Sequence, residues 1–348
     1  MPRWAGVHDV TLSAGGAGPG SCTVPVMSDV FRLAVVGVGR MGRFHAECLA
    51  DAPGLELVAV VDGRREVASE VAHIAGCRVV GSIENLTGLV DGVVVATPTP
   101  SHPEMVERAL GAGLNVLCEK PISLHEGDGA ALDALAAERG LVLQVGFWRR
   151  FSPPWVTARD LIREGRIGRL VLARFSQWDA DPPPPGFCDP AVSGGLAVDC
   201  GVHEFDLAEW LTDDRIETVE ARPLPLVDPA VGEAGDVDNL LVLLSLTSGA
   251  SAIVDLSRNC RYGDDVRTEI LGSDGAVFID LLPAGRLRIA DSTGVQIVES
   301  AAEPMAAGVV AQALAFARRS RGDTVAIPTG VDSDRALAVA RAAQRTGA

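Results

Sequence analysis

The 348-residue chain is short of positive charge and contains a single lysine. Lysine and arginine total 30 residues against 46 aspartates and glutamates, so the formal net charge is −16. A chain this acidic, with no run of basic residues, is repelled by nucleic-acid phosphates and by anionic lipid, which argues against both as partners. All the other cations are arginine, so Lys120 stands out. A compact ammonium group with an adjustable pKa can do chemistry that a guanidinium cannot, so a function is expected here, with retention by chance as the alternative.

Long apolar runs and paired cysteines are also missing. No apolar run approaches the ~20 residues of a membrane-spanning helix. The seven cysteines are scattered and include no C-x-x-C pair, which argues against a disulfide framework and against a thiolate zinc site. We therefore expect reduced thiols and a cytoplasmic protein. Residues 1–26 lack the charged and apolar regions of a signal peptide, and we expect residues 1–29 to be a disordered extension.

From Phe31 onward, short apolar runs alternate with amphipathic stretches. The apolar runs are Leu33–Val36, Leu57–Val61, Val93–Ala96, Val116–Cys118 and Val142–Val145. The amphipathic stretches lie around Phe44–Ala50, Glu66–Ile74, Glu104–Leu110 and Ala130–Glu138. Nearly continuous apolar strands separated by helices indicate a parallel sheet covered on both faces. The pattern predicts an α/β dinucleotide-binding (Rossmann) domain over residues 30–148.

After residue 148 the pattern changes to longer strand-like runs. They are Val237–Leu246, Ala252–Ser257, Arg267–Leu271, Ala276–Asp280 and Arg286–Ala290. Helices are expected at Thr157–Glu164, Ala307–Arg318 and Asp334–Arg345. The second half, residues 149–348, is therefore predicted to be an α+β domain with a mostly antiparallel open sheet. The run Val237–Leu246 is more apolar than a half-exposed strand requires, so its outer face could pair with another subunit.

A glycine-rich turn follows the first predicted strand. Gly37, Gly39 and Gly42 form G-x-G-x-x-G between a strand and a helix, and Asp62 ends the second strand 20 residues beyond Gly42. In this context the glycines allow a tight turn, close approach of a pyrophosphate, and packing of the helix on the strand. Asp62 would bind the adenosine ribose hydroxyls and repel a 2′-phosphate, which favours NAD over NADP.

Arg64 and Arg65 lie just beyond Asp62 and keep NADP as the less favoured alternative.

Three polar segments are expected to meet where the strands end: residues 96–102, residues 119–121 and residues 199–206. Asp199 and His203 are four residues apart and would share one face of a helix, with Asp206 continuing the stripe. The stripe has three interpretations: a packed or solvated helix face, a metal site, or a proton-transfer site. We favour the last and assign no metal, because an ammonium group at Lys120 would oppose a dication. His203 would then accept the hydroxyl proton, and Lys120 would polarise the reacting oxygen. Asp199 would orient either the substrate hydroxyl or the imidazole.

The motifs together resemble the glucose–fructose oxidoreductase, inositol dehydrogenase and rhizopine-catabolism (Gfo/Idh/MocA) family. They follow one another from about Phe31 to Gly330 as GVGRMGRFH (37–45), ATPTPSH (96–102), EKPISL (119–124), VGFWRRF (145–151), SGG (193–195) and D-x-x-x-H-x-F-D (199–206). The chain looks most similar to bacterial inositol 2-dehydrogenases. These share the proline-rich loop before the double glycine and a segment like residues 262–269.

The resemblance implies the residues of the site. Lys120, Asp199 and His203 correspond to the catalytic lysine, aspartate and histidine of the family. The peptide bond at the position of Lys120–Pro121 is commonly cis in the family, and a cis bond is expected here. The residues expected to contact the substrate are Lys120, Trp148, Arg150, Asp199, His203 and Tyr262, with packing an equal alternative for Tyr262. The residues expected to contact the cofactor are Gly37, Gly39, Arg40, Met41, Gly42, Asp62, Arg64, Thr97, Pro98, His102, Glu119 and Lys120.

The resemblance further implies an NAD-dependent dehydrogenase that oxidises a secondary hydroxyl of a cyclitol or sugar. An alternative is an NAD(P)-dependent dehydrogenase or reductase of an aminocyclitol or sugar intermediate in antibiotic biosynthesis. A non-enzymatic alternative is a regulatory NAD-binding protein of the same fold, which the presence of Lys120, Asp199 and His203 argues against. Relatives are commonly dimers or tetramers built on the second sheet, so a homodimer or homotetramer is expected.

Overall fold

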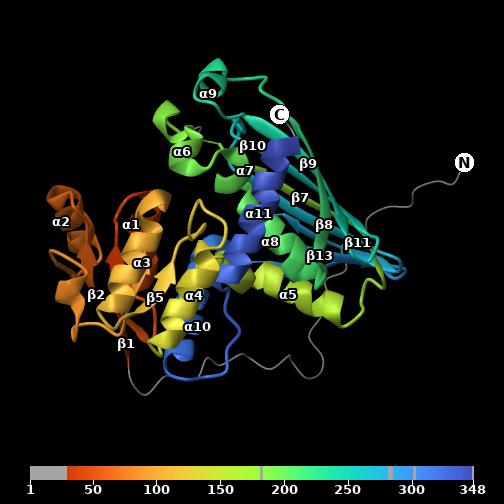
Figure 1. Cartoon of the computed structure of the whole chain (residues 1–348). Helices are drawn as coiled ribbons and strands as arrows, with labels where there is room; N and C mark the ends of the chain where they lie inside the picture. The colour runs from red at the N-terminus through yellow and green to blue at the C-terminus, as the bar shows by residue number, and fades with distance from the viewer. Residues whose placement is uncertain (1–29, 181–182, 281–284, 301–302, 347–348) are drawn as a thin grey trace, which may run out of the picture.

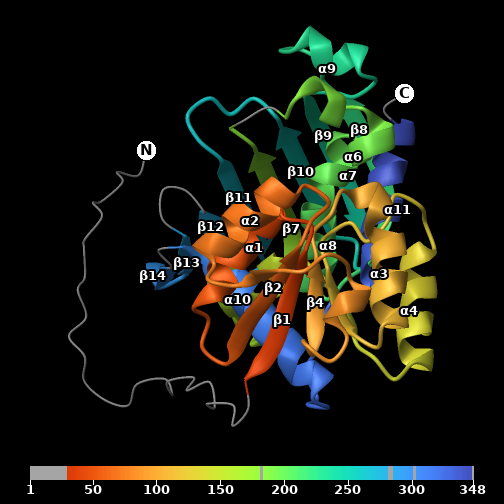
Figure 2. The same ribbon diagram turned by 90° about the vertical axis from the view of Figure 1, so that its left-hand side faces the viewer.

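The computed structural model describes residues 30–180, 183–280, 285–300 and 303–346 (Figure 1). The extension expected over residues 1–29 lies outside these ranges. The described chain forms two β-sheets, with helices between them (Figures 1 and 2). None of the helices in these ranges is both long enough and apolar enough to cross a bilayer.

The first sheet has six parallel strands in the order β3-β2-β1-β4-β5-β6. The strands are β1 (Phe31–Val36), β2 (Leu55–Val61), β3 (Arg78–Val79), β4 (Gly92–Val95), β5 (Asn115–Cys118) and β6 (Leu143–Val145). The predicted parallel sheet is confirmed. The strand order reverses between β1 and β4, and at such a reversal a crevice opens beyond the carboxyl ends of the strands.

Four helices of the first domain follow the predicted alternation with the strands. They are α1 (Arg40–Ala50), α2 (Arg65–Ile74), α3 (His102–Gly111) and α4 (Asp128–Glu138). Strands β1, β4 and β5 are buried almost throughout, because apolar side chains on both of their faces are covered.

The second sheet has eight strands in the order β14-β13-β12-β11-β7-β10-β9-β8. The strands are β7 (Leu170–Trp178), β8 (Ile216–Pro223), β9 (Asn239–Leu246), β10 (Ser251–Ser257), β11 (Asp265–Gly272), β12 (Gly275–Asp280), β13 (Arg286–Asp291) and β14 (Gly294–Ser300). All neighbours are antiparallel except β7 and β10, which run parallel. The predicted mostly antiparallel sheet is confirmed.

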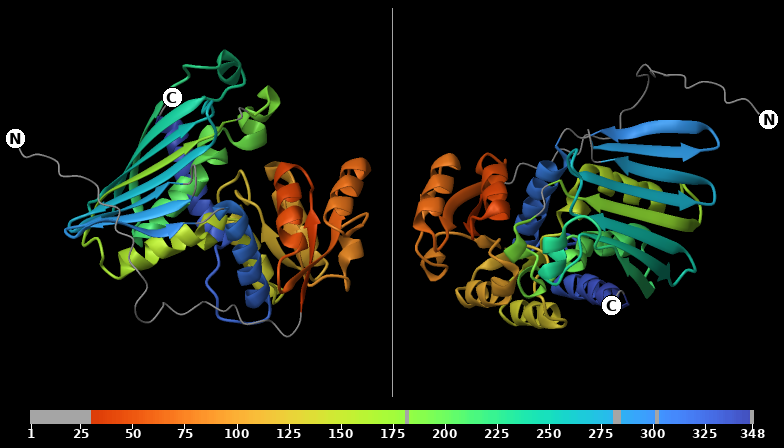
Figure 3. Two further views of the ribbon diagram at one scale, coloured as in Figure 1. Left: turned by 180° about the vertical axis from the view of Figure 1, so that it is seen from behind. Right: turned by 90° about the horizontal axis from the view of Figure 1, so that it is seen from above.

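Helices cover one face of the second sheet (Figure 3). They are α5 (Pro153–Arg163), α8 (Gly201–Thr212) and α11 (Gly330–Thr346). In β9 the side chains alternate: Leu240, Val242 and Leu244 are buried beneath the helices, whereas Leu241 and Leu243 are exposed on the opposite face. The outer face is therefore apolar at β9, as expected, and its pairing with another subunit stays a prediction.

Helix α10 (Pro304–Ser320) packs on the first sheet. Although it follows the second sheet in the chain, its Ala313, Phe316 and Ala317 belong to the apolar cluster on one face of the first sheet. The Phe316 ring packs edge-on against Phe31 of β1, with the ring centres 5.7 Å apart. The nucleotide domain therefore includes this late helix.

Two short helices, α6 (Pro190–Ser193) and α7 (Leu196–Asp199), precede α8 and bring the second domain to the carboxyl edge of the first sheet. The Gly194–Gly195 pair separates them, and both glycines have φ of +82°. Helix α7 ends at Asp199 and α8 begins at Gly201, so residues 196–212 form a nearly continuous helical segment. This segment brings Asp199 to the crevice and places His203 one helical turn further along.

Candidate active site

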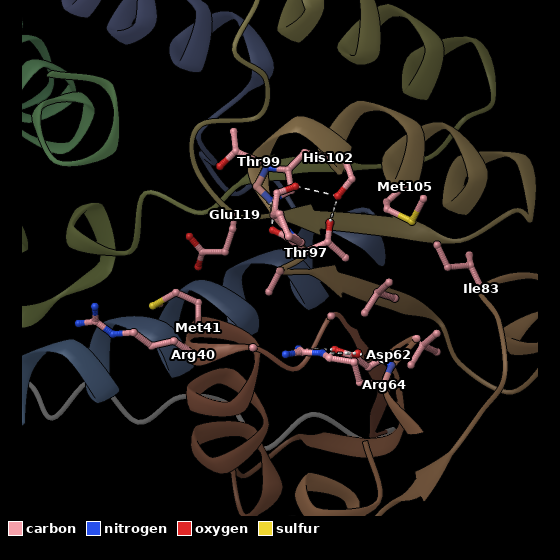
Figure 4. Close-up of a pocket in the computed structure, with 18 of the residues that line it drawn as sticks. Arg40, Met41, Asp62, Arg64, Ile83, Thr97, Thr99, His102, Met105 and Glu119 are labelled. Atoms are coloured by element: carbon pink, nitrogen blue, oxygen red, sulfur yellow. Dashed lines mark hydrogen bonds and ion pairs between the residues drawn. The ribbon is translucent and has the colours of Figure 1, made fainter. Parts of the chain in front are cut away.

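A cavity of about 770 Å³ lies at the carboxyl edge of the first sheet. Its walls come from the glycine-rich turn, from the ends of β2, β4 and β5, and from the second domain (Figure 4). Every residue expected to contact the cofactor lines it except Gly42, which lies one position beyond Met41. The cavity therefore joins the two predicted sites, because Lys120 and Asp199 line it as well.

The three glycines of the turn have distinct local environments. Gly37 has φ of +83°, and a Cβ atom there would lie 2.7 Å from the Thr97 side chain. A Cβ on Gly42 would lie 1.8 Å from the carbonyl oxygen of Gly37, so only glycine allows α1 to pack there. A Cβ on Gly39 would meet nothing within 4 Å. Gly37 and Gly42 therefore serve the protein itself, whereas the open space at Gly39 suits a ligand.

The first turn of α1 is suited to phosphate. Gly39 precedes the helix without a side-chain cap, and the first turn holds no acidic residue. The first N–H groups of a helix lack partners within the helix and carry partial positive charge. A dinucleotide pyrophosphate placed against Gly39 would satisfy them, so these residues fit the implied cofactor.

Asp62 directly follows β2 and lines the cavity at the end where the adenosine is expected (Figure 4). Its Oδ2 accepts the Val38 backbone N–H at 2.9 Å, and its Oδ1 accepts the Arg64 N–H at 2.8 Å. The Arg64 guanidinium folds back onto the same carboxylate at 3.1 Å. Burial raises the pKa of Asp62, but these bonds outweigh it and hold the pKa below its ordinary value. Asp62 is therefore an anchored carboxylate in the cavity wall.

His102 lies at the other end of the cavity, where it connects the loop after β4 with the loop after β5 (Figure 4). Its Nδ1 lies 2.8 Å from the Pro121 carbonyl oxygen and its Nε2 lies 2.7 Å from that of Thr97. Burial lowers the pKa of His102. Because both ring nitrogens face backbone carbonyls, His102 shapes the loops that carry Thr97 and Lys120 and does not present a free nitrogen to a ligand.

Glu119 has a partner that the sequence did not indicate. His45 on α1 is fully buried, and its Nε2 lies 2.6 Å from Glu119 Oε1. Burial raises the pKa of Glu119, but the bond to His45 and the charge of Lys120 bring it below its ordinary value.

Lys120 meets Asp199 across the two domains. Lys120 Nζ donates to the Asp199 carbonyl oxygen at 2.6 Å and lies 3.9 Å from its Oδ1. The Lys120–Pro121 peptide bond is cis, as the resemblance implied. An ammonium group has three N–H donors, so it can bind both Asp199 oxygens and still offer one donor to the cavity.

His203 lies on α8, one helical turn after Asp199. Its ring is buried against the edges of Phe147 and Trp148, with ring centres 6.2 Å and 6.3 Å apart. Burial, followed by the charges of Lys120 and Arg149, lowers the pKa of His203 well below its usual value. The imidazole is therefore neutral at physiological pH and able to accept a proton.

Two residues expected to contact substrate have other partners. Arg150 binds the carboxylate of Asp206 and lies 3.5 Å from Asp332. Tyr262 is 72% exposed and donates its hydroxyl to Asp265, away from the cavity. Trp148, by contrast, packs beside His203. Because Arg150 engages Asp206, the stripe of Asp199, His203 and Asp206 does not act as one site, and no group of three metal-ligating side chains occurs within the described ranges.

Two apolar residues that the second domain contributes to the cavity wall were not expected. Phe187 and Val192, from the segment before the double glycine, line the cavity opposite the first domain. Both are more than one-third exposed. The signal in the sequence was an apolar residue next to a proline-rich loop, which by itself indicates no ligand.

Comparisons with known proteins agree with the fold. Residues 31–147 match the family described as "Oxidoreductase family, NAD-binding Rossmann fold", and residues 155–278 match the GFO/IDH/MocA C-terminal domain. Inositol 2-dehydrogenase of Rhizobium meliloti is 37% identical over 71% of this chain and 74% of its own length. The scyllo-inositol 2-dehydrogenase (NAD(+)) of Bacillus subtilis is 34% identical over 77% of this chain and 79% of its own length.

Solved structures agree as well. A putative myo-inositol dehydrogenase of Sinorhizobium meliloti superposes with a TM-score of 0.82 at 33% identity, covering 91% of this chain and 97% of that one. The scyllo-inositol dehydrogenase of Lactobacillus casei, with bound NAD(H) and scyllo-inositol, has a TM-score of 0.78 at 26% identity, covering 91% and 97%.

Proposed function

This chain belongs to the GFO/IDH/MocA oxidoreductase family, and we propose that it oxidises a secondary hydroxyl of a cyclitol similar to myo-inositol to the ketone, with NAD as the oxidant. The observation that carries the proposal is the meeting of Lys120 and Asp199 at the edge of the dinucleotide cavity, with His203 one helical turn further on. The relatives named inositol dehydrogenases support the substrate class.

Each of the three residues has a role in this reaction. NAD, when bound, supplies the acceptor for the hydride that leaves the substrate carbon. The third N–H of Lys120 binds the reacting oxygen and stabilises the negative charge that develops there. His203, held neutral by burial, takes the hydroxyl proton onto a ring nitrogen. Asp199 keeps the ammonium group of Lys120 in place through its carbonyl oxygen and its carboxylate.

The surroundings of Asp62 support NAD over NADP. Arg64 is one of the two arginines that could receive a 2′-phosphate, and its guanidinium is bound to the Asp62 carboxylate. A 2′-phosphate would have to displace that contact and approach an ionised side chain, which costs affinity.

An aminocyclitol or sugar, including an intermediate of antibiotic biosynthesis, is the second candidate substrate. The observation that favours it lies beside Asp199, where the Cys200 thiol sits 3.2 Å from the Asp179 carboxylate. A carboxylate so close to the site suits a substrate that carries an ammonium group.

One assay separates these functions. The purified chain receives NAD or NADP with myo-inositol, scyllo-inositol, an aminocyclitol or glucose, and NADH absorbance is followed over time. We expect NADH with a cyclitol and NAD. Turnover only with the aminocyclitol or glucose moves the substrate to the second candidate. No turnover with any of them, while NADH still binds, contradicts the proposal and favours a regulatory role.

A further inference from the structure

Arg258 is a buried cation that the proposed mechanism does not use. It follows the end of β10 in the second domain, and only 1% of it is exposed. Burying a guanidinium group costs several kcal/mol unless carboxylates surround it. Its partners are Asp199 and Asp236: Nη1 lies 3.5 Å from Asp199 Oδ2 and Nη2 lies 3.2 Å from Asp236 Oδ2.

These two contacts reach both ends of the short helix α7. The Asp236 carboxylate accepts the backbone N–H of Leu196, the first residue of α7, at 2.9 Å and 3.0 Å. Asp199 is the last residue of the same helix. Arg258 therefore holds the start of α7 through Asp236 and its end through the Asp199 side chain. The approach is tight, since a Cβ on Gly195 would lie 2.8 Å from Asp236 Oδ1.

The Asp199 carboxylate consequently lies between two cations from different domains. Lys120 faces its Oδ1 at 3.9 Å, and Arg258 faces its Oδ2 at 3.5 Å. The terminal torsion of an aspartate side chain is broad, and contact with one cation leaves rotation of the carboxylate open. The second cation on the opposite oxygen restricts it. With Oδ2 held by Arg258, Oδ1 stays directed at Lys120.

We infer that Arg258 is a positioning residue, which sets the rotation of the Asp199 carboxylate and through it the direction of the Lys120 ammonium group in the cavity. The inference rests on the proposed function for its catalytic consequence. The contacts among Arg258, Asp199 and Lys120 do not depend on the proposed function.

The geometric part is tested without turnover, because Lys120 is the single lysine of the chain. Reductive methylation with ¹³C-formaldehyde gives one lysine signal in a carbon NMR spectrum, besides that of the α-amine. The signal is compared in the wild type, D199N, R258M and R288Q. R288Q removes a half-exposed cation of the same sheet, paired with Asp280, and serves as the matched control.

We expect the R258M signal to move from the wild-type position toward that of D199N, and the R288Q signal to stay. An R258M signal that coincides with the wild type while D199N moves overturns the inference. A D199N signal equal to the wild type also overturns it, since the carboxylate would then not face Lys120. If R258M does not fold, R258K takes its place with the same expectations, because lysine cannot bind two carboxylates as a planar fork does.

The catalytic part uses the substrate identified for the wild type. We expect R258M to lower kcat by about 100-fold, as small misplacements of a catalytic group do, with the KM for NAD and the Kd for NADH unchanged. A purely structural role for Arg258 predicts a lower melting temperature and a normal kcat for the folded fraction, which would refute the inference. Inactivity of the wild type would count against the proposed function alone, because the NMR comparison stands without it.

Discussion

Replacing Gly39 with alanine separates the needs of the cofactor from those of the fold. Gly39 has φ of −69° and ψ of −156°, a backbone conformation open to any residue. A Cβ there would meet no protein atom within 4 Å. The alanine methyl group would therefore occupy only the space in which we expect the dinucleotide phosphates.

The substitution should therefore affect cofactor binding more than stability. In the free protein, Gly39→Ala should change the free energy of unfolding by less than about 0.5 kcal/mol, or stabilise it by up to about 1 kcal/mol through the less flexible unfolded chain. In the complex, the methyl group must be accommodated against the pyrophosphate at a cost of about 1–3 kcal/mol. This corresponds to an NADH Kd weaker by about 5- to 150-fold.

Gly42→Ala is the matched control, since its Cβ would lie 1.8 Å from the Gly37 carbonyl oxygen. The backbone must shift, so this variant should lose about 2–3 kcal/mol of stability before any ligand is added. Both variants are measured by urea unfolding and by NADH fluorescence titration. Wild-type NADH affinity in Gly39→Ala, or a stability loss as large as that of Gly42→Ala, would refute the assignment of this space to the phosphates.

The remaining predictions concern the reacting group, the choice of cofactor and the sheet packing. His203→Gln should lower kcat by about 10²- to 10⁴-fold with NADH binding retained. Burial lowers the pKa of His203 below its usual 6.5, so the decrease of the wild-type kcat at acid pH should be centred below pH 6.5. A decrease centred above pH 6.5 would contradict a neutral buried base. Asp62→Asn removes the repulsion of a 2′-phosphate and frees Arg64, so kcat/KM with NADP relative to that with NAD should rise by about 10- to 100-fold. An unchanged ratio would show that Asp62 does not select the cofactor. Phe316→Ala should cost about 3–5 kcal/mol in urea unfolding, because the ring packs fully buried on Phe31, whereas a loss below about 1 kcal/mol would contradict that packing.

Much of the fold could be predicted because its strands are buried. The five longer strands of the first sheet are nearly continuous apolar runs, and each was recognisable. Strand β3 was not, because its two residues are exposed and carry no apolar pattern. Strands β7, β8 and β14 were missed because each contains several polar residues among its apolar ones. The return of α10 to the first sheet could not be predicted, since an apolar helix face does not indicate which sheet it covers.

The site also contains residues that could be predicted from the sequence and residues that could not. Lys120, Asp199 and His203 stand in motifs with recognisable spacing, and the structure brings the first two into contact. Arg258 left no signal, because a buried arginine depends on carboxylates that come from distant parts of the chain. Tyr262 stood out as the one tyrosine, yet rarity alone does not direct a side chain into a cavity.

The return of α10 bears on how the protein is made. During synthesis, the strands of the first sheet emerge from the ribosome long before Phe316, and the whole second sheet is translated in between. Until α10 has been synthesised, the apolar surface formed by Phe31, Val94 and Leu117 is not covered by that helix. The nascent nucleotide domain therefore exposes an aggregation-prone apolar surface, and its completion waits for residues near the end of the chain.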